Sequence, residues 1–549
     1  MKGSSAIAHI LKKEGVDHLF CFPVNPLIDA AAELGIRPIM PCTERTVIGM
    51  ADGYSRVNNG KRIGVCAVQQ GPGVENTFGG VAQAFSDSSP VLVFPGGPPQ
   101  SRQASLPTFD PVPSFQHVAK WAARINQPPR IPEFLRRAFT YLRMGRPGPV
   151  VLELPQDVAL ADLEDPTQSY KGVQASRALA DPQNIKAALK AILAAKNPLL
   201  HAGLGVLYSE AWGELREFAE LMQIPVMTTL PGKSCFPENH PLSLGCGGLS
   251  GSKVVAQFLS ECDLIFAIGS SMSISYFAAP IPPGKAAIQL TIDERDLNKD
   301  YPVDIPLMGD VKLTLGEMIE EVKRRVGKDG KKGDDAVARK IKAAREGWLN
   351  EWMPLLTSDE VPVNPYRVIW DAQKALDLSS TIATHDAGNP RDQTAPLVAR
   401  RKSQQLHRVG EIHPPGIQPS PGPGGQSGDA AENGRPHHGG WRLRDERDGH
   451  CHRGAEQNRH LDDPPEQLLP GRIREAYPHR HKTVRDKIPR RRLLQSGRRA
   501  GGLCRADRSS QGYHPGRPAG SRENKDRKAR GAGSDNQRRK PPSQVLVIT

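Results

Sequence analysis

The chain has 549 residues and a formal net charge of +14 at pH 7, a length that suggests about three or four domains and permits cores that need no disulfide or metal staple. Its eight cysteines include no CxxC pair, which predicts a reducing, cytoplasmic location and argues against a structural zinc site. No segment approaches the ~20 apolar residues of a membrane span, and the N-terminal segment is too charged for a signal peptide, so neither secretion nor a membrane partner is expected.

The excess of positive charge is confined to residues 401–549. They contain 31 Lys and Arg against 16 Asp and Glu, 10 of the 16 histidines, and neither Phe nor Met, whereas residues 1–400 contain 42 basic and 43 acidic residues. The basic runs of residues 401–549 would attract nucleic acid only non-specifically, and no recognition fold accompanies them. We therefore expect no specific nucleic-acid partner.

Short apolar runs alternate with helical patterns through residues 1–330. Helices are predicted over 77–85 and 214–222. Strands are predicted over eight runs, namely 19–22, 62–68, 91–94, 149–154, 198–201, 224–229, 263–268 and 287–292. Strands that alternate with helices predict an α/β fold whose parallel sheets are covered by helices on both faces.

The alternation continues to residue 400 and then stops. Helices are predicted over 341–352 and 365–376, and a strand over 381–384. From about Arg401 no apolar period of 2 or 3.6 is sustained, so the segment cannot bury enough apolar surface to offset the entropy lost on ordering it. We predict a disordered basic tail over 401–549, in which residues 545–548 are an isolated apolar run.

Five groups of motifs follow one another within the first 310 residues. They are Thr43-Glu44-Arg45 with Met50-Ala51-Asp52-Gly53-Tyr54, Gly71-Pro72-Gly73 with Asn76, Gly145-Arg146-Pro147-Gly148-Pro149, Gly232-Lys233 with Phe236-Pro237-Glu238, and Thr291-Ile292-Asp293 with Gly309-Asp310. In this order they resemble the thiamine-diphosphate-dependent enzymes of the acetolactate synthase and 2-oxo-acid decarboxylase superfamily.

The resemblance implies three domains of α/β build. A pyrimidine-binding domain is expected at 1–165, a central domain at 183–325, a linker at 326–361 and the start of a pyrophosphate-binding domain at 362–400, followed by the aberrant tail. It also implies that two chains pair, with each cofactor between the pyrimidine domain of one and the pyrophosphate domain of the other. A homodimer or homotetramer is therefore expected.

Glu44 is the candidate catalytic residue. It follows the end of a predicted strand, where α/β proteins place ligands. The residue type alone favours a solvated surface Glu paired with Arg45. The resemblance instead implies that Glu44 hydrogen-bonds N1′ of the cofactor's aminopyrimidine, a task that suits a partly desolvated carboxyl.

The candidate cofactor-binding residues are Gly71, Pro72, Gly73, Asn76 and Gln116. Two glycines let a backbone approach a ligand closely, although most such triplets form ordinary turns. The resemblance implies a cofactor-facing loop here and places Gln116 near the reacting carbon.

Other positions leave their roles open. Gln69, Gln70 and Val24 depart from the small residues usual in the family, which affects the identity of the substrate. Lys233 is expected to be a positioning or surface residue. Gly203-Leu204-Gly205 is no dinucleotide fingerprint, and FAD in the central domain is left open.

The motif that holds Mg²⁺ in this family is missing. The resemblance requires Gly-Asp-Gly followed by about 25 to 30 residues and an Asn, and Mg²⁺ then neutralises the diphosphate. No such motif follows residue 386, so no metal ligand is assigned. We hypothesise a frameshift between about Leu397 and Arg408, because Phe, Met, periodicity and motif are lost together.

The implied activity is carbon–carbon chemistry on 2-oxo acids. The first expectation is an acetolactate synthase-like carboligase, which decarboxylates pyruvate and condenses the product with a second 2-oxo acid. The alternatives are a 2-oxo-acid decarboxylase of the benzoylformate type and a non-catalytic remnant. This chain itself is expected to be impaired.

Overall fold

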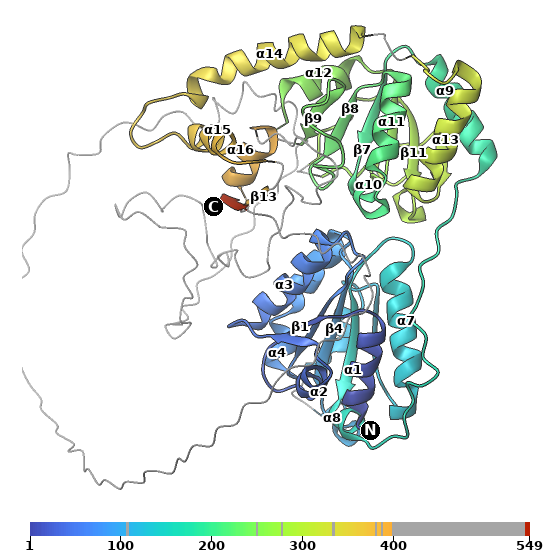
Figure 1. The fold of residues 1–549 in the computed structure, drawn as a ribbon, viewed down its shortest axis with the longest axis vertical. Coiled ribbons are helices and arrows are strands. Elements are labelled where there is room, and N and C mark those ends of the chain that lie inside the picture. The colour runs from blue at the N-terminus through green and yellow to red at the C-terminus, as the bar shows by residue number, and fades with distance from the viewer. Residues whose placement is uncertain are drawn as a thin grey trace, which may run out of the picture. The chain divides into compact units, whose positions relative to one another are not determined.

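The computed structural model describes residues 1–105, 109–248, 251–275, 278–331, 335–378, 381–385, 388–397 and, for the backbone alone, 544–548 (Figure 1). Most of the predicted tail, residues 401–543, lies outside the described residues. No described helix combines the length and the apolar character needed to cross a membrane. The described part contains two six-stranded sheets and a two-stranded sheet.

The first sheet has the strand order β2-β1-β3-β4-β6-β5, and all its ladders are parallel. Its strands are β1 (His18–Cys21), β2 (Arg37–Ile39), β3 (Gly64–Val68), β4 (Val91–Gly97), β5 (Trp121–Arg124) and β6 (Val150–Pro155). Every residue of β3 and β6 is buried, as expected for strands that are covered on both faces.

Helices cover both faces of the first sheet. They are α1 (Gly3–Lys13), α2 (Leu27–Glu33), α3 (Glu44–Val57), α4 (Pro72–Glu75), α5 (Phe78–Ser86), α6 (Pro111–Phe115), α7 (Ile131–Arg143) and α8 (Gln156–Leu160). One apolar core joins α1, α2 and α7 to the sheet, and a second joins α3 and α5 to it. The connection from β1 to β2 covers one face through α2, and the connection from β2 to β3 covers the other through α3. The strand order therefore changes direction at β1, which leaves a crevice at the carboxyl edge.

The second sheet repeats this plan with the order β12-β11-β10-β7-β8-β9. Its strands are β7 (Pro198–Ala202), β8 (Val226–Thr229), β9 (Ser243–Gly247), β10 (Leu264–Ile268), β11 (Ala286–Thr291) and β12 (Ile305–Met308). Its helices are α9 (Pro182–Ala194), α10 (Leu204–Ser209), α11 (Trp212–Met222), α12 (Lys253–Glu261), α13 (Val311–Val326) and α14 (Ala336–Leu356). The order changes direction between β7 and β10, which is again a crevice position.

The third sheet contains only β13 (Thr381–His385) and β14 (Gln544–Ile548) among the described residues, flanked by α15 (Pro365–Ala375) and α16 (Asn389–Leu397). The two strands are parallel, with Thr381 opposite Gln544. The prediction of a disordered tail is therefore wrong for 544–548, an apolar and partly β-branched run of the kind that fits a sheet.

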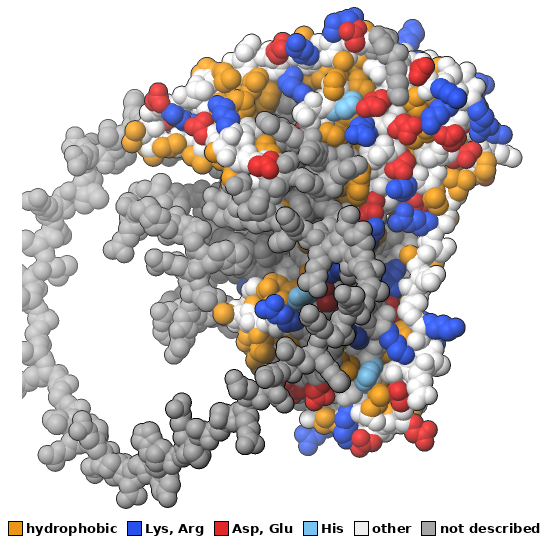
Figure 2. Space-filling model, viewed as in Figure 1, with side chains coloured by type: hydrophobic (Ala, Val, Ile, Leu, Met, Phe, Trp, Pro, Cys, Tyr) orange, Lys and Arg blue, Asp and Glu red, His pale blue; other side chains and the backbone are white. Residues whose placement is uncertain are grey.

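Apolar side chains remain exposed near this short sheet. Figure 2 shows them over α14 and α15, and they include Leu355, Val361, Val363 and Val368. An exposed apolar patch of this kind is what an α/β layer presents when no further element covers it among the described residues.

Gly64 shows how closely α3 approaches the first sheet. A Cβ at this position would lie far inside the contact distance of the Ala51 carbonyl oxygen. We expect Gly64→Ala to destabilise the fold by about 1–3 kcal/mol, because the overlap is with backbone that cannot rotate away. Thermal unfolding followed by circular dichroism measures it, and Gly79→Ala, where an added Cβ meets nothing within 4 Å, is the matched control. Equal midpoints for the two variants would contradict this packing.

Candidate functional site

Glu44 is the first residue of α3, at the carboxyl edge of the first sheet. Thr43 caps the helix, with its side-chain oxygen accepting a hydrogen bond from the backbone N–H of Thr46 at 3.3 Å. Glu44 is only 6% exposed, and Asn76 Nδ2 donates to its Oε2 at 3.2 Å. The interpretation of Glu44 as a solvated surface residue is therefore wrong.

The Gly71-Pro72-Gly73 loop lies beside Glu44. Gly71 has a φ of +68°, in the region that favours glycine, and α4 begins with the proline that follows. A Cβ on Gly73 would lie 3.4 Å from Glu44 Oε1 and would overlap the Gln69 side chain. The structure thus brings the predicted glycine loop and Asn76 together with the predicted catalytic carboxylate.

Gln116 is placed differently. It is exposed and is the C-cap residue of α6. The helix before it is fixed by Phe115, which is buried and packs against Phe78 with ring centroids 5.3 Å apart. No hydrogen bond or ion pair joins Gln116 to Glu44 among the described residues, and its place near the reacting carbon stays a prediction.

The loop after β1 holds a strained residue at the same sheet edge. Val24 has a φ of +71° and is 78% exposed, although a β-branched residue is rarely found in this region. Asn25 locks the loop, because its Nδ2 donates to the carbonyl oxygens of Val68 at 3.0 Å and Phe94 at 3.2 Å. The sequence shows that Val24 departs from the residue usual in the family, but its backbone strain is visible only in the structure.

A cavity of about 980 Å³ lies at the carboxyl ends of β7, β10 and β11. Two tight backbone approaches shape it. Gly203 N–H donates to the Ile268 carbonyl at 2.9 Å, and Gly205 N–H donates to the Gly269 carbonyl at 2.8 Å. A Cβ on Gly205 would lie 2.7 Å from Gly269 Cα, so only glycine permits the two loops to meet here.

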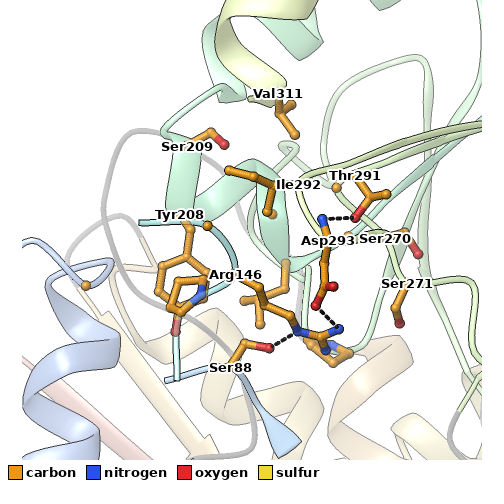
Figure 3. Close-up of a pocket in the computed structure, with 18 of the residues that line it drawn as sticks. Ser88, Arg146, Tyr208, Ser209, Ser270, Ser271, Thr291, Ile292, Asp293 and Val311 are labelled. Carbon is orange, nitrogen blue, oxygen red and sulfur yellow. Dashed lines mark hydrogen bonds and ion pairs between the residues drawn. The ribbon is translucent and has the colours of Figure 1, made fainter. Parts of the chain in front are cut away.

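Arg146 crosses one wall of this cavity (Figure 3). Its Nε donates to Ser88 Oγ at 2.7 Å, and its guanidinium lies 2.9 Å from an oxygen of Asp296 and 3.6 Å from one of Asp293. Arg295, which hydrogen-bonds Asp293, and then Arg146 lower the pKa of the Asp293 carboxyl below its ordinary value. The cavity therefore carries balanced charges on its wall.

Comparisons with known proteins agree with this arrangement. A family model described as the N-terminal TPP binding domain of thiamine pyrophosphate enzymes matches residues 1–121, and one described as their central domain matches residues 185–318. A probable acetolactate synthase large subunit of Methanocaldococcus jannaschii is 33% identical over 416 residues, which span 71% of this chain and 67% of that protein.

This chain belongs to the thiamine-diphosphate-dependent enzyme family. The acetolactate synthase large subunit of Lactococcus lactis is 33% identical over 329 residues, 58% of this chain and 57% of that protein. The glyoxylate carboligase of Escherichia coli O157:H7 is 29% identical over 392 residues, 68% of this chain and 64% of that protein. The α/β fold and the family resemblance predicted from the motifs are confirmed.

Lys233 is another buried charge in this thiamine-diphosphate family member. It is 1% exposed, forms an ion pair with Glu238 and donates to the carbonyl oxygen of Ala395 in α16 at 2.9 Å. The surface interpretation of Lys233 is therefore wrong. The sequence feature that could have indicated this burial is Glu238, the acidic residue five positions later in the same motif.

No group of three or more His, Cys, Asp and Glu side chains is arranged to hold a metal ion among the described residues. His385 is buried on β13, and Asp386 lies outside the described residues. Of the family's domains, the matches cover the N-terminal TPP binding domain and the central domain.

His201 on β7 lines the cavity. The pH dependence of protein stability tests whether the His201 imidazole is buried. Burial lowers the pKa of His201 from 6.5 to about 4, so the folded protein holds a neutral imidazole and the unfolded chain binds the extra proton. The contribution to stability is complete above pH 6.5 and is lost as the pH falls to 4, by about 3 kcal/mol. We expect His201→Leu to lack this loss.

Urea unfolding at pH 7, 5.5 and 4 measures the effect, since the difference in free energy of unfolding between wild type and variant should change with pH. His117→Leu, at an exposed histidine, is the control and should follow the wild type. Parallel curves for His201→Leu and wild type would show that the imidazole is solvated.

Proposed function

We propose that Glu44, the Gly71-Pro72-Gly73 loop and Asn76 bind the aminopyrimidine half of thiamine diphosphate. We further propose that the fold is built for an acetolactate synthase-like reaction, in which a 2-oxo acid loses CO₂ and the remaining fragment condenses with a second 2-oxo acid. The observation that carries the proposal is the buried Glu44 carboxylate, which is held by Asn76 and faces a glycine.

The residues fit half of the cofactor. Thiamine diphosphate, when bound, supplies the electron sink for breaking and forming carbon–carbon bonds next to a carbonyl. Asn76 occupies one Glu44 oxygen, and the other faces Gly73, where an added Cβ would lie 3.4 Å from it and would overlap the Gln69 side chain. Burial keeps water from competing for that oxygen, so Glu44 is suited to hold a proton against a ring nitrogen.

Two other functions remain as alternatives. The relatives are named acetolactate synthases and a glyoxylate carboligase, which favours carboligation over a benzoylformate-type decarboxylase. Product analysis on an intact relative separates them, because a carboligase yields a 2-hydroxy-3-oxo acid such as acetolactate and a decarboxylase yields an aldehyde. The other alternative is that this chain is a non-catalytic remnant of such an enzyme.

The interpretation of this chain as a non-catalytic remnant is supported by the missing motif for the diphosphate half of the cofactor. No Gly-Asp-Gly motif occurs in the chain, and both matching family models end before residue 319. We propose that a frameshift near residues 397–408 removed the Mg²⁺ and diphosphate ligands and that this chain does not turn over. The third unit (362–400) then remains as a fragment of a pyrophosphate-binding domain.

We expect the purified protein to bind thiamine diphosphate weakly or not at all and to release no CO₂ from pyruvate, since the diphosphate charge stays uncompensated. Titration calorimetry with and without Mg²⁺ measures the binding, and the Methanocaldococcus jannaschii relative is the positive control. Tight, Mg²⁺-dependent binding would exclude the impairment. The encoding DNA, read in all three frames downstream of codon 390, should show the missing motif in a shifted frame.

A second proposal concerns the cavity of the second sheet. We propose that it holds a dinucleotide cofactor, FAD being the first candidate. The supporting observation is the position of the cavity at the point where the strand order changes direction, with glycine backbones in contact around it, as is usual for nucleotide sites in α/β proteins.

FAD titration followed by flavin fluorescence tests this. We expect saturable quenching with the wild type and at least about tenfold weaker binding with Ser271→Trp, which fills part of the cavity. Ser260→Trp, at an exposed position of α12, is the control for the added indole. No saturable quenching with the wild type would remove FAD from consideration.

A further inference from the structure

Residues 171–179 connect the first sheet to α9 of the second, and we call this segment the strap. It contains no helix or strand (Figure 1), and every residue in it except Val173 is exposed. Five of its residues nevertheless line the cavity, namely Gly172, Val173, Ala175, Ser176 and Arg177. An exposed, irregular segment thus forms part of the wall of a large cavity.

One end of the strap is fixed by Glu14, the C-cap residue of α1, which packs on the first sheet. The Glu14 side chain is completely buried and forms an ion pair with Arg143. Its Oε1 accepts hydrogen bonds from Val173 N–H at 3.0 Å and from Tyr170 Oη at 2.5 Å. Arg143 also donates to the Val173 carbonyl at 2.5 Å, so both backbone polar groups of Val173 are held.

The other end is fixed to the second sheet. The Arg177 guanidinium donates to the carbonyl oxygen of Ser209 at 3.3 Å and lies 3.7 Å from a carboxylate oxygen of Asp310. The Asp310 N–H donates to the Ala178 carbonyl at 2.8 Å. These contacts are more exposed than the Glu14 contacts, because the Arg177 side chain is 40% exposed.

Between the two ends, residues 174–176 make no hydrogen bond with the rest of the described chain. Segments with few buried apolar groups and solvent-exposed backbone open at low free energy while the surrounding core stays folded. A passive linker would be equally irregular, but it would have no need of a buried carboxylate that accepts its backbone N–H. Removal of such a charge-assisted hydrogen bond should favour local opening by about tenfold or more.

We propose that the strap is a movable wall of the cavity and that Glu14 locks it shut. Release of Val173 from Glu14 frees residues 171–176, while Arg177 keeps the far end attached. The lock sets how quickly a molecule leaves the cavity. This role rests on the proposal that the cavity binds a cofactor, whereas the locking of the strap does not.

Hydrogen exchange of the full chain, followed by mass spectrometry, tests the lock. In Glu14→Ala we expect the amides of 171–176 to exchange about tenfold faster or more, and peptides from β7 and β10 to be unchanged. Arg177→Ala, a milder variant, should accelerate 176–179 and leave Val173 protected. Arg216→Ala, at an exposed arginine outside the cavity, is the control and should change neither.

If Glu14→Ala accelerates exchange throughout the chain, Tyr170→Phe decides the matter, because it weakens the lock and keeps the ion pair. Unchanged exchange of Val173 in Tyr170→Phe would then overturn the proposal, as would unchanged strap exchange in a folded Glu14→Ala. A second arm measures FAD release by stopped-flow fluorescence, where Glu14→Ala should release FAD several-fold faster than Arg216→Ala.

The two proposals fail separately. If the wild type binds no FAD but Val173 exchange responds to Glu14, the cofactor proposal falls and the lock stands. If FAD binds and its release is the same in Glu14→Ala although the strap exchanges faster, the strap is not a wall on the exit path and this inference is overturned.

Discussion

All ladders of the two six-stranded sheets are parallel, and this geometry decides where the chain can place ligand-binding groups. A parallel pair needs a crossover over the face of the sheet, so every loop that follows a strand emerges at one edge. Glu44 and Gly71 reach the same edge of the first sheet for this reason, although 27 positions and a buried strand separate them in the sequence. Gly203 and Gly269 meet in the second sheet by the same geometry.

The edge of a sheet also explains which strands the sequence predicted. The interior strands β3, β4, β6, β7 and β10 are mostly buried and apolar, although β6 contains Glu153 and β7 contains His201, and all were predicted within a few residues. In the two six-stranded sheets, the strands that were missed, β5, β9 and β12, are all at sheet edges, where at least one residue of each is only partly buried. An edge strand needs less apolar sequence, because water or a loop covers one side, so its pattern resembles that of a loop.

The residues of the candidate site also divide into those whose placement the sequence could predict and those whose placement it could not. Glu44, the glycine loop and Asn76 lie within 33 residues and follow motif spacing, so their meeting could be predicted from the family resemblance. The burial of Lys233 depends on Ala395, and that of Glu14 on Tyr170 and Val173, across separations of more than 150 residues. Apart from Glu238, which lies in the same motif as Lys233, no local pattern predicts these contacts, because a lysine or glutamate in an amphipathic segment is most often solvated.

The pairing of β13 with β14 has a consequence for the synthesis of this chain. The strands are separated by roughly 160 residues, and closing a loop of that length carries an entropic cost that grows only slowly with length. The delay is the larger effect, since β13 cannot find this partner before residue 548 has been made. During that interval the unpaired edge of β13 is available to any other nascent chain. Crowded polysomes and fast induction should therefore favour inclusion bodies, and slow expression at low temperature should favour the pairing within one molecule.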